Sequence, residues 1–289
     1  MNKSFTLIEI LVVIVIIGII SAFIIVSMAG VSSKANIAKS QAFANSLRNS
    51  LLLNLVSEWK LNGDASDSWG VNNGTLIGPT HLPVAKSGPD CVSGGCYQFD
   101  GTEDYITAGS LANNLGQSFT VEVWSKRLGP TGSYGNLVQI NTWGAGQGGF
   151  LIFDRNNGVI QGRIYSSADT TETGLSVETN VPDNIWRHYV FTWAKPYLGA
   201  YLNSAKLGPV SWDHDVGWTN NVILIANWSG CYFYGLLDDV RIYNAAIPTS
   251  QIEQNYYSGL NRLLVHNEFD VMEYGWRLGE LRFNVMHND

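Results

Sequence analysis

An uninterrupted apolar run near the N-terminus constrains this chain more than any other feature. No Asp, Glu, Lys or Arg occurs between Glu9 and Lys34, and the apolar character extends from Ile10 to Gly30. A helix of about 20 apolar residues, rising roughly 1.5 Å per residue, spans the hydrocarbon core of a bilayer. A secretory signal peptide fits less well, because the run is too long and no small-x-small cleavage site follows it. The sequence therefore predicts a membrane-spanning helix.

One acid marks the start of this run. A carboxylate at Glu9 is costly in a membrane unless a partner pairs with it. The segment Ser-Phe-Thr-Leu-Ile-Glu from Ser4 to Glu9, followed by the apolar run, resembles the prepilin signature of type IV pilins and secretion pseudopilins. The resemblance implies that a prepilin peptidase cuts between Ser4 and Phe5 and that the new amino group of Phe5 is methylated. It also implies that Glu9 pairs with this amine in a neighbouring subunit during assembly.

Two positions depart from the pilin pattern. Ser4 stands where the family usually has Gly, and no Pro kinks the chain near Val26, so a straighter helix is expected. Further on, apolar residues recur mostly at four-residue steps up to Leu55, which predicts an amphipathic helix packed against the rest of the protein. A flexible stalk is the alternative. We expect a leader over residues 1–4 and one long helix over residues 5–55.

The remainder of the chain is acidic. The protein has 289 residues and a formal net charge of −7, but residues 56–289 hold 13 Lys and Arg against 23 Asp and Glu. Nucleic-acid binding needs clustered Lys and Arg, so no nucleic-acid partner is expected for this part.

Three cysteines bear on the compartment in which the protein works. Cys91 and Cys96 flank the flexible sequence Val-Ser-Gly-Gly, which permits a small disulfide loop, and Cys231 is left over. One local bridge with an odd thiol suits an oxidising compartment. Three reduced cysteines are the alternative. A zinc site is not expected, because no second Cys pair or nearby His completes four ligands.

From residue 56 the pattern changes to short runs of β-branched and aromatic residues separated by Gly, Pro, Asn and Asp. The predicted strands are Ser57–Leu61, Cys96–Phe99, Tyr105–Ala108, Phe119–Lys126, Leu137–Asn141, Gly149–Asp154, Val159–Tyr165, Trp186–Ala194, Ala200–Leu202, Val222–Ala226 and Tyr232–Tyr243. Ten or more short strands with no long helix among them predict an all-β sandwich of about 200 residues.

Several phrases in this region resemble laminin G-like, concanavalin A-type jelly-roll domains. In chain order they are Trp59–Leu61, Asp67–Thr75, Tyr97–Tyr105, Phe119–Trp124, Trp186–Val190, Gly235–Asn244 and Ala245–Glu253. The resemblance implies a jelly-roll head over residues 56–259 that binds glycans or proteins, with His188 at a structural core-strand position. The predicted fold of the whole chain is therefore mainly β, with a long N-terminal helix.

An enzyme is not expected. Glycoside hydrolysis needs two carboxylates about 5 to 10 Å apart. Related laminarinase-like hydrolases place them on one strand as Glu-x-Asp-x-x-Glu, whereas Glu122 stands alone in its predicted strand. The sequence also lacks a nucleophile elbow and a zinc-protease helix.

The laminin G-like resemblance further implies a structural calcium ion between the first and last strands. Asp238 matches the acid of the closing strand, and Asp239, Asp64 or Asp67 would assist it. Carboxylate oxygens are ligands that Ca²⁺ prefers. The alternative is that these acids are solvated turn residues or pair with Arg241.

Aromatic residues in predicted loops are the other candidate site. Trp143, Trp212 and Trp218 fall in such loops, the last two around Asp213 and Asp215. Aromatic faces stack on sugar rings while Asp side chains hold the hydroxyls, so these five residues are predicted to bind a ligand. Packing in the core or at its rim is the alternative, and with 10 Trp in the chain it must apply to most of them.

Apolar residues alternate with charges at roughly helical spacing after residue 259, which predicts a tail of one or two short helices over residues 260–289. Together these features predict a minor or adhesive type IV pilin that displays a lectin-like head. It would be a single-pass membrane precursor first, and then part of an extracellular filament or the cell surface. Its expected partners are prepilin peptidase, other pilin subunits, and glycans or surface proteins. A pseudopilin of a type II secretion or DNA-uptake system is the alternative, and a membrane-tethered glycan-processing enzyme is the least favoured one.

Overall fold

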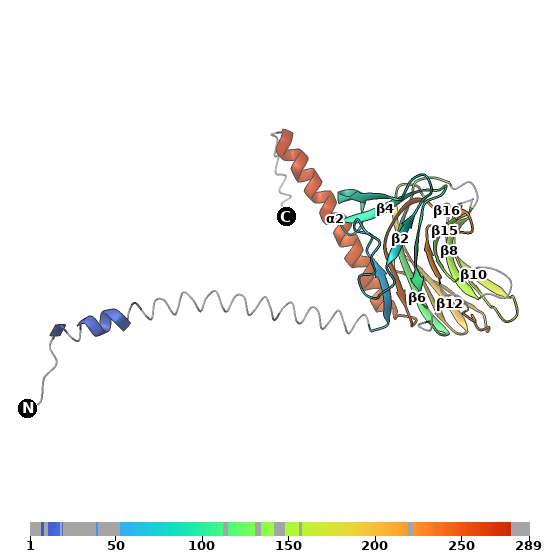
Figure 1. Cartoon of the computed structure of the whole chain (residues 1–289), viewed down its shortest axis with the longest axis horizontal. Coiled ribbons are helices and arrows are strands. Elements are labelled where there is room, and N and C mark those ends of the chain that lie inside the picture. Colours follow the sequence, from blue (N-terminus) through green and yellow to red (C-terminus); the bar gives the residue numbers. More distant parts are fainter. Residues whose placement is uncertain are drawn as a thin grey trace, which may run out of the picture. The chain divides into compact units, whose positions relative to one another are not determined.

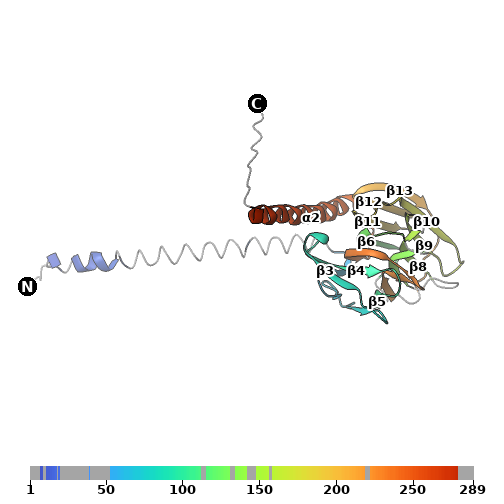
Figure 2. The ribbon, with the colours of Figure 1, turned by 90° about the horizontal axis from the view of Figure 1, so that it is seen from above.

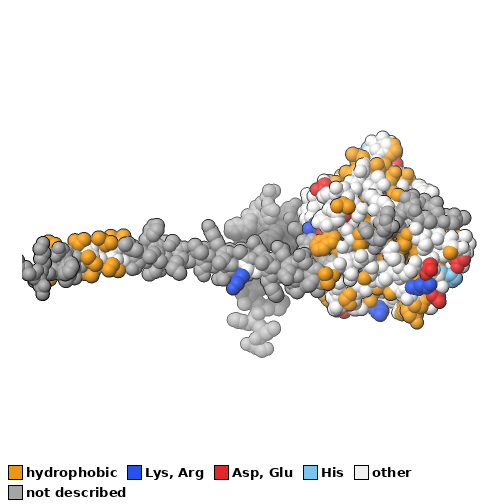
Figure 3. Space-filling model, turned by 60° about the horizontal axis from the view of Figure 1, so that its bottom comes forward, with side chains coloured by type: hydrophobic (Ala, Val, Ile, Leu, Met, Phe, Trp, Pro, Cys, Tyr) orange, Lys and Arg blue, Asp and Glu red, His pale blue; other side chains and the backbone are white. Residues whose placement is uncertain are grey.

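The chain divides into two compact units, Met1–Leu53 and Asn54–Asp289. The computed structural model describes residues 7–8, 11–17, 19, 39, 53–111, 115–130, 134–141, 148–155, 158–218 and 222–278, with the side chains of the last helix described up to residue 264. The described residues before residue 50 are helical, and all but Lys39 have hydrophobic side chains (Figure 3). Within the described part of the chain, no helix has the length and apolar character to cross a membrane. Most of the predicted span lies outside the described residues.

Two antiparallel sheets form a sandwich in the second unit (Figures 1 and 2). In spatial order, the eight-stranded sheet contains β13 (Ala205–Ser211), β12 (Tyr197–Leu202), β11 (Trp186–Ala194), β6 (Ser118–Arg127), β17 (Tyr234–Tyr243), β4 (Gly95–Asp100) and β3 (Val84–Ser87), with β1 (Leu55–Trp59) also paired to β17. The seven-stranded sheet contains β10 (Glu172–Thr179), β9 (Val159–Tyr165), β8 (Gly149–Arg155), β7 (Gly135–Ile140), β14 (Val222–Ile225), β5 (Tyr105–Ser110) and β2 (Gly74–Ile77). This architecture confirms the predicted jelly-roll head.

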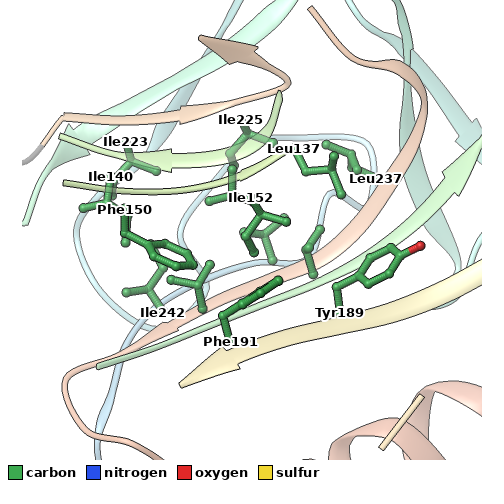
Figure 4. Packing of buried hydrophobic residues seen from close by; sticks show 14 of the residues in the cluster. Leu137, Ile140, Phe150, Ile152, Tyr189, Phe191, Ile223, Ile225, Leu237 and Ile242 are labelled. Carbon is green, nitrogen blue, oxygen red and sulfur yellow. The ribbon is translucent and has the colours of Figure 1, made fainter. Parts of the chain in front are cut away.

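The core lies between the two sheets. Strand alternation sends Phe150 and Ile152 of β8 toward Phe191 of β11, and all three are fully buried (Figure 4). The Phe150 ring lies 5.8 Å from Phe191 and 5.3 Å from Phe119, measured between centroids. Interdigitated aromatic and aliphatic side chains from two inner faces are what holds a sandwich together.

The central strands of the eight-stranded sheet are buried on both faces. Nearly every residue of β6 and β17 is buried, including those whose side chains point away from the core. Their outer face is covered by α2 (Thr249–Leu278), which runs along this sheet and extends past it (Figures 1 and 2). The predicted boundary at residue 260 is wrong, because one helix of 30 residues begins eleven positions earlier. The segment Ala245–Glu253, which the family resemblance places in the sandwich, contains the first turn of this helix.

Apart from the short β15 (Asn227–Trp228), the described strands that the sequence does not predict lie at the ends of the two sheets: β3, β13, β2 and β10. Their side chains are mostly exposed or half-buried. An edge strand has a neighbour on one side only and little core to contact, so it does not need the apolar alternation that reveals a central strand.

Candidate functional site

A short hairpin brings aromatic side chains to the seven-stranded sheet. Its strands are β15 (Asn227–Trp228) and β16 (Cys231–Tyr232), and its turn residues Ser229 and Gly230 have φ values of 48° and 86°. Two left-handed residues in succession match the twist of a tight hairpin. The side-chain amide of Asn136 on β7 donates to the Asn227 carbonyl at 2.8 Å and ties the hairpin to the sheet.

Five rings around this hairpin form what we call the aromatic surface: Tyr105, Tyr134, Phe153, Trp228 and Tyr232. The Tyr134 ring meets Phe153 edge-on at 5.7 Å and Trp228 at 6.4 Å, while Tyr105 lies 6.2 Å from Tyr232. Phe153 is buried, Tyr134 is 37% exposed, and the other three rings are half-buried. Rings that are held by packing and remain partly open offer rigid, amphipathic contact area.

Polar side chains lie beside these rings on β9 and β10. The Arg163 guanidinium lies 5.3 Å from the centroid of Phe153. Its Nε donates to Gln161 Oε1 at 3.0 Å and its Nη1 to Glu172 Oε1 at 3.1 Å. Gln161 and Arg163 are half-buried, and Glu172 is exposed. The arrangement places hydrogen-bonding groups next to an apolar face, which is the combination that a sugar requires.

Two buried amide oxygens add acceptors to the same face. Asn136 lies opposite Phe153 in the register of β7 and β8, and Gln139 lies opposite Leu151. Phe153 and Leu151 alternate with the inward-pointing Ile152, so both amides belong to the outer face of the sheet. Asn136 Oδ1 and Gln139 Oε1 have no hydrogen-bond partner among the described residues. An unpaired buried acceptor costs roughly 1–3 kcal/mol, so an internal water that donates to it is favoured there.

The predicted ligand-binding tryptophans lie elsewhere. Trp212 is 7% exposed and packs 5.5 Å from Trp193 in the core, so its predicted role is wrong, because a buried ring has no face to offer a sugar. Trp218 is half-buried and donates from Nε1 to the Gly116 carbonyl at 2.9 Å. Its role in binding stays a prediction. Trp143 lies outside the described residues.

The two acids predicted beside those tryptophans share one cation. Lys195 Nζ lies 2.8 Å from Asp215 Oδ1 and 3.4 Å from Asp213 Oδ1, and both acids are exposed. The intervening His214 pairs with Asp169 instead. These contacts fix the loop after β13, and ligand binding by the two acids stays a prediction.

The acids predicted to hold calcium do not converge. Asp67 accepts backbone hydrogen bonds from Glu58 at 2.9 Å and Gly70 at 2.8 Å on one oxygen, and from Asn72 at 3.0 Å on the other. Asp64 accepts from Ser66 in an exposed turn. Among the described residues, no three His, Cys, Asp or Glu side chains form a metal-ligating group. The four acids therefore do not fit one shared site, and a bound calcium ion stays a prediction.

Asp238 and Asp239 are neighbours on β17 with separate partners. Asp238 accepts from the Val92 and Ser93 backbone N–H groups at 2.7 and 3.0 Å. Burial, and then the adjacent Asp239 carboxylate, raise the pKa of Asp238 to about 8. Asp239 lies 3.1 Å from Arg241 Nη2 and also pairs with Arg262 of α2. Both carboxylates thus face protein donors.

A network of charges is sealed between α2 and the eight-stranded sheet. Glu122 Oε1 lies 2.9 Å from His188 Nε2 and 2.8 Å from Arg241 Nη1. Its other oxygen accepts from Asn255 of α2 at 2.7 Å. Burial acts to raise the pKa of Glu122, but the charges of Arg241 and His188 outweigh it and lower that pKa to about 2. His188 is fully buried, in agreement with its predicted structural position.

Stacked rings lie beside this network. Tyr256 of α2 stacks on Trp124 of β6 with 5.7 Å between centroids and 11° between planes. Gly259 sits so close above the same indole that an added Cβ would come within 2.5 Å of Trp124 Cζ2. Only a glycine lets the helix backbone approach to this distance.

The structure contains the predicted disulfide between Cys91 and Cys96, and Cys231 is a free, half-buried thiol. The predicted processing and assembly residues, Ser4, Phe5 and Glu9, lie outside the described residues.

Comparison with protein families matches the two parts of the chain separately. The model of the concanavalin A-like lectin/glucanases superfamily matches residues 100–253. The chain belongs to this superfamily. The model of the prokaryotic N-terminal methylation motif matches residues 1–25. Both matches confirm the family resemblances stated above, a lectin-like head and a pilin-type N-terminus. A search of curated proteins finds no match.

Solved structures share the fold of the lectin-like head at low identity. Domain 4 of AbnA, an extracellular arabinanase from Geobacillus stearothermophilus in complex with arabinotriose, is 20% identical with a TM-score of 0.57, over 70% of this chain and 97% of that one. The binding domain of Paraclostridial Mosquitocidal Protein 1 is 19% identical with a TM-score of 0.56, over 71% of this chain and 52% of that one. The receptor binding domain of botulinum neurotoxin D is 14% identical with a TM-score of 0.56, over 72% of this chain and 53% of that one. The chain thus spans about half of the two toxin domains.

Proposed function

We propose that this chain is a subunit of a type IV pilus or related filament, and that its head binds carbohydrate through the aromatic surface. The observation that carries the proposal is the combination of a methylation motif at residues 1–25 with a concanavalin A-like domain. An anchor alone would not need that motif, and a soluble lectin would not carry it.

The assembly role rests on the N-terminal residues. Prepilin peptidase is the proposed processing enzyme, acting between Ser4 and Phe5. Glu9 would then pair with the free amine of Phe5 in the next subunit, because a carboxylate in a bilayer needs a cationic partner. The precursor is proposed to sit in the cytoplasmic membrane and the mature subunit in an extracellular filament.

The binding role rests on the outer face of the seven-stranded sheet. Tyr134 and Trp228 present partly open rings, and Arg163 and Gln161 lie beside them. The related arabinanase domain was solved with arabinotriose, and the two toxin relatives are binding domains. These relatives support a binding head over an enzymatic one.

Mass spectrometry of the mature chain tests the assembly role. We expect a protein that begins at Phe5 and carries one added methyl group on its amine. A chain that still begins at Met1 in cells with an active prepilin peptidase would contradict both the pilin and the pseudopilin assignments. Labelling the filament surface with an antibody to the head separates them, since a pilin is displayed on a surface filament.

Binding of the full chain in detergent micelles to an oligosaccharide array, with arabino-oligosaccharides included, tests the head. We expect retention on a subset of glycans. A blank array would contradict the carbohydrate proposal and leave protein partners. Repeating the array with a chelator tests the predicted calcium ion, which requires that binding or thermal stability fall when the chelator is present.

A further inference from the structure

Three levels of contact hold α2 on the eight-stranded sheet. The first level is the hydrogen bond from Asn255 to Glu122 at 2.7 Å. The second is the stack of Tyr256 on Trp124. The third lies farther along the helix, where Leu263 packs in one apolar cluster with Trp124 and with Val92 of the disulfide loop.

The disulfide loop therefore forms part of the surface on which α2 rests. Cys91, Val92 and Cys96 are fully buried. The residue just before the loop is tied to β11 as well, because Trp186 Nε1 donates to the Asp90 carbonyl at 3.0 Å. Val92 is thus placed between the sheet and the helix by a loop that the disulfide closes.

A bulge in β17 connects the loop and the helix. The register of β17 against β6 shifts between Asp238 and Arg241, and Asp239 has a φ of 45°. Successive residues of a regular strand point to opposite faces, whereas a bulge re-aims them. Here Asp238 accepts from the loop at Val92 N–H, and Asp239 pairs with Arg262 of α2. The bulge in β17 therefore contacts both the disulfide loop and α2.

We propose that the Cys91–Cys96 loop is a redox latch for α2, which docks fully on the eight-stranded sheet only after the disulfide has formed. In the latch reaction the two thiols exchange with a disulfide oxidant. The Sγ–Sγ bond forms, the S–S bond of the oxidant breaks, and the oxidant leaves as two thiols that take up the two protons. Docking of α2 is thereby coupled to transfer of the head into an oxidising compartment.

Opening of the disulfide loop weakens the contact between Leu263 of α2 and Val92. Gly94, with a φ of 96°, and Gly95 give the open loop wide conformational freedom, so closing it without the disulfide costs more entropy. When the loop leaves, the buried Asp238 loses the Val92 and Ser93 donors. Leu263 also loses its contact with Val92.

Hydrogen exchange followed by mass spectrometry tests the latch in the full chain in detergent micelles. The oxidised protein is compared with its reduced form and with the variant Cys91→Ser/Cys96→Ser. We expect amides of residues 256–264 to exchange about ten-fold faster without the disulfide, while those of β6 and β11 change by less than about two-fold. Unchanged exchange in α2, or an equal increase throughout the sheets, would overturn the proposal.

A reciprocal measurement keeps both cysteines and does not depend on the folding of the double variant. If the disulfide favours docking, docking must favour the disulfide by the same factor. In a glutathione redox buffer, Tyr256→Ala should lower the equilibrium ratio of disulfide to dithiol by about five-fold or more. The matched control is Leu264→Ala, whose side chain is 52% exposed on the same helix. Equal ratios in the two variants would overturn the latch.

Discussion

The two outer faces of the sandwich differ in what covers them. Beneath α2, Glu122, His188 and Arg241 are buried and paired with one another, and Asn255 of the helix completes the set. On the seven-stranded sheet, the rings of Tyr134 and Trp228 lie partly open. A face covered by a helix offers a ligand no exposed ring, whereas a face with partly open rings is available to one.

The comparison also bears on catalysis. A carboxylate beside an imidazole, as in Glu122 and His188, is a residue pair that general acid–base catalysis uses. Here Tyr256 of α2 stacks on the His188 ring, and Arg241 holds Glu122. The residue types alone would suggest chemistry, and their burial makes them part of the scaffold.

The largest expected effect comes from Glu122→Gln. The amide removes the carboxylate that pairs with both His188 and Arg241 and leaves Arg241 paired with Glu58 and Asp239, so we expect the free energy of unfolding to fall by about 3 kcal/mol near neutral pH. Glu122 has a pKa lowered to about 2, and its contribution is present above pH 4.5 and lost as the pH falls toward 2. The variant should therefore lose less stability in acid than the wild type. Thermal unfolding followed by tryptophan fluorescence measures both, with the exposed Glu253→Gln as control. If the two variants lose the same free energy of unfolding, the charged network under α2 does not stabilise the fold.

A smaller effect is expected from Gly259→Ala. The new Cβ would lie within 2.5–2.9 Å of the Trp124 indole, so the helix must shift outward despite the better helix propensity of Ala. We expect a net loss of about 1–3 kcal/mol. Ser258→Ala, on the exposed side of the same helix, should be neutral or slightly stabilising. If Gly259→Ala also stabilises the protein in a thermal melt, α2 is not packed as closely as described.

The smallest effect concerns pH and Asp238→Asn. The pKa of Asp238 is about 8 in the fold and near 3.8 when unfolded, so the folded state binds the extra proton and stability falls as the pH rises through this range. Asp104 and Asp154 have pKa values raised by burial to about 6, which confines their contribution mainly to lower pH. Between pH 6 and 8, the variant should show a slope of stability reduced by up to about 1.4 kcal/mol per pH unit. An unchanged slope, matching that of the exposed control Asp213→Asn, would contradict the assignment.

The sequence predicts the central parts of the fold better than its edges. Strands such as β9 and β11 have the predicted bounds, because a strand packed on the core needs apolar residues at alternate positions. The edge strands β2, β3, β10 and β13 lack that pattern. The start of α2 was missed for another reason, since the segment after β17 matched a family phrase and was assigned to the sandwich.

The candidate sites show the same limit. The disulfide was visible because Cys91 and Cys96 are close in sequence. The partners of Glu122 were not, because Arg241 and Asn255 lie more than a hundred positions away and only the fold brings them together. One sequence feature could have revealed the aromatic surface. The Ser-Gly pair after Trp228 is typical of a tight hairpin turn, and aromatic residues lie on both sides of it.

Ligand binding by two matched variants tests the contrast between the faces most directly. Tyr134→Ala removes a ring of the aromatic surface, and Tyr197→Ala removes a ring that is 54% exposed on β12 of the other sheet. Calorimetric titration of the full chain with the best oligosaccharide from the array compares both with the wild type. The account predicts that Tyr134→Ala weakens binding by about ten-fold or more and that Tyr197→Ala leaves it unchanged. Equal affinity in all three proteins, or a loss confined to Tyr197→Ala, would contradict it.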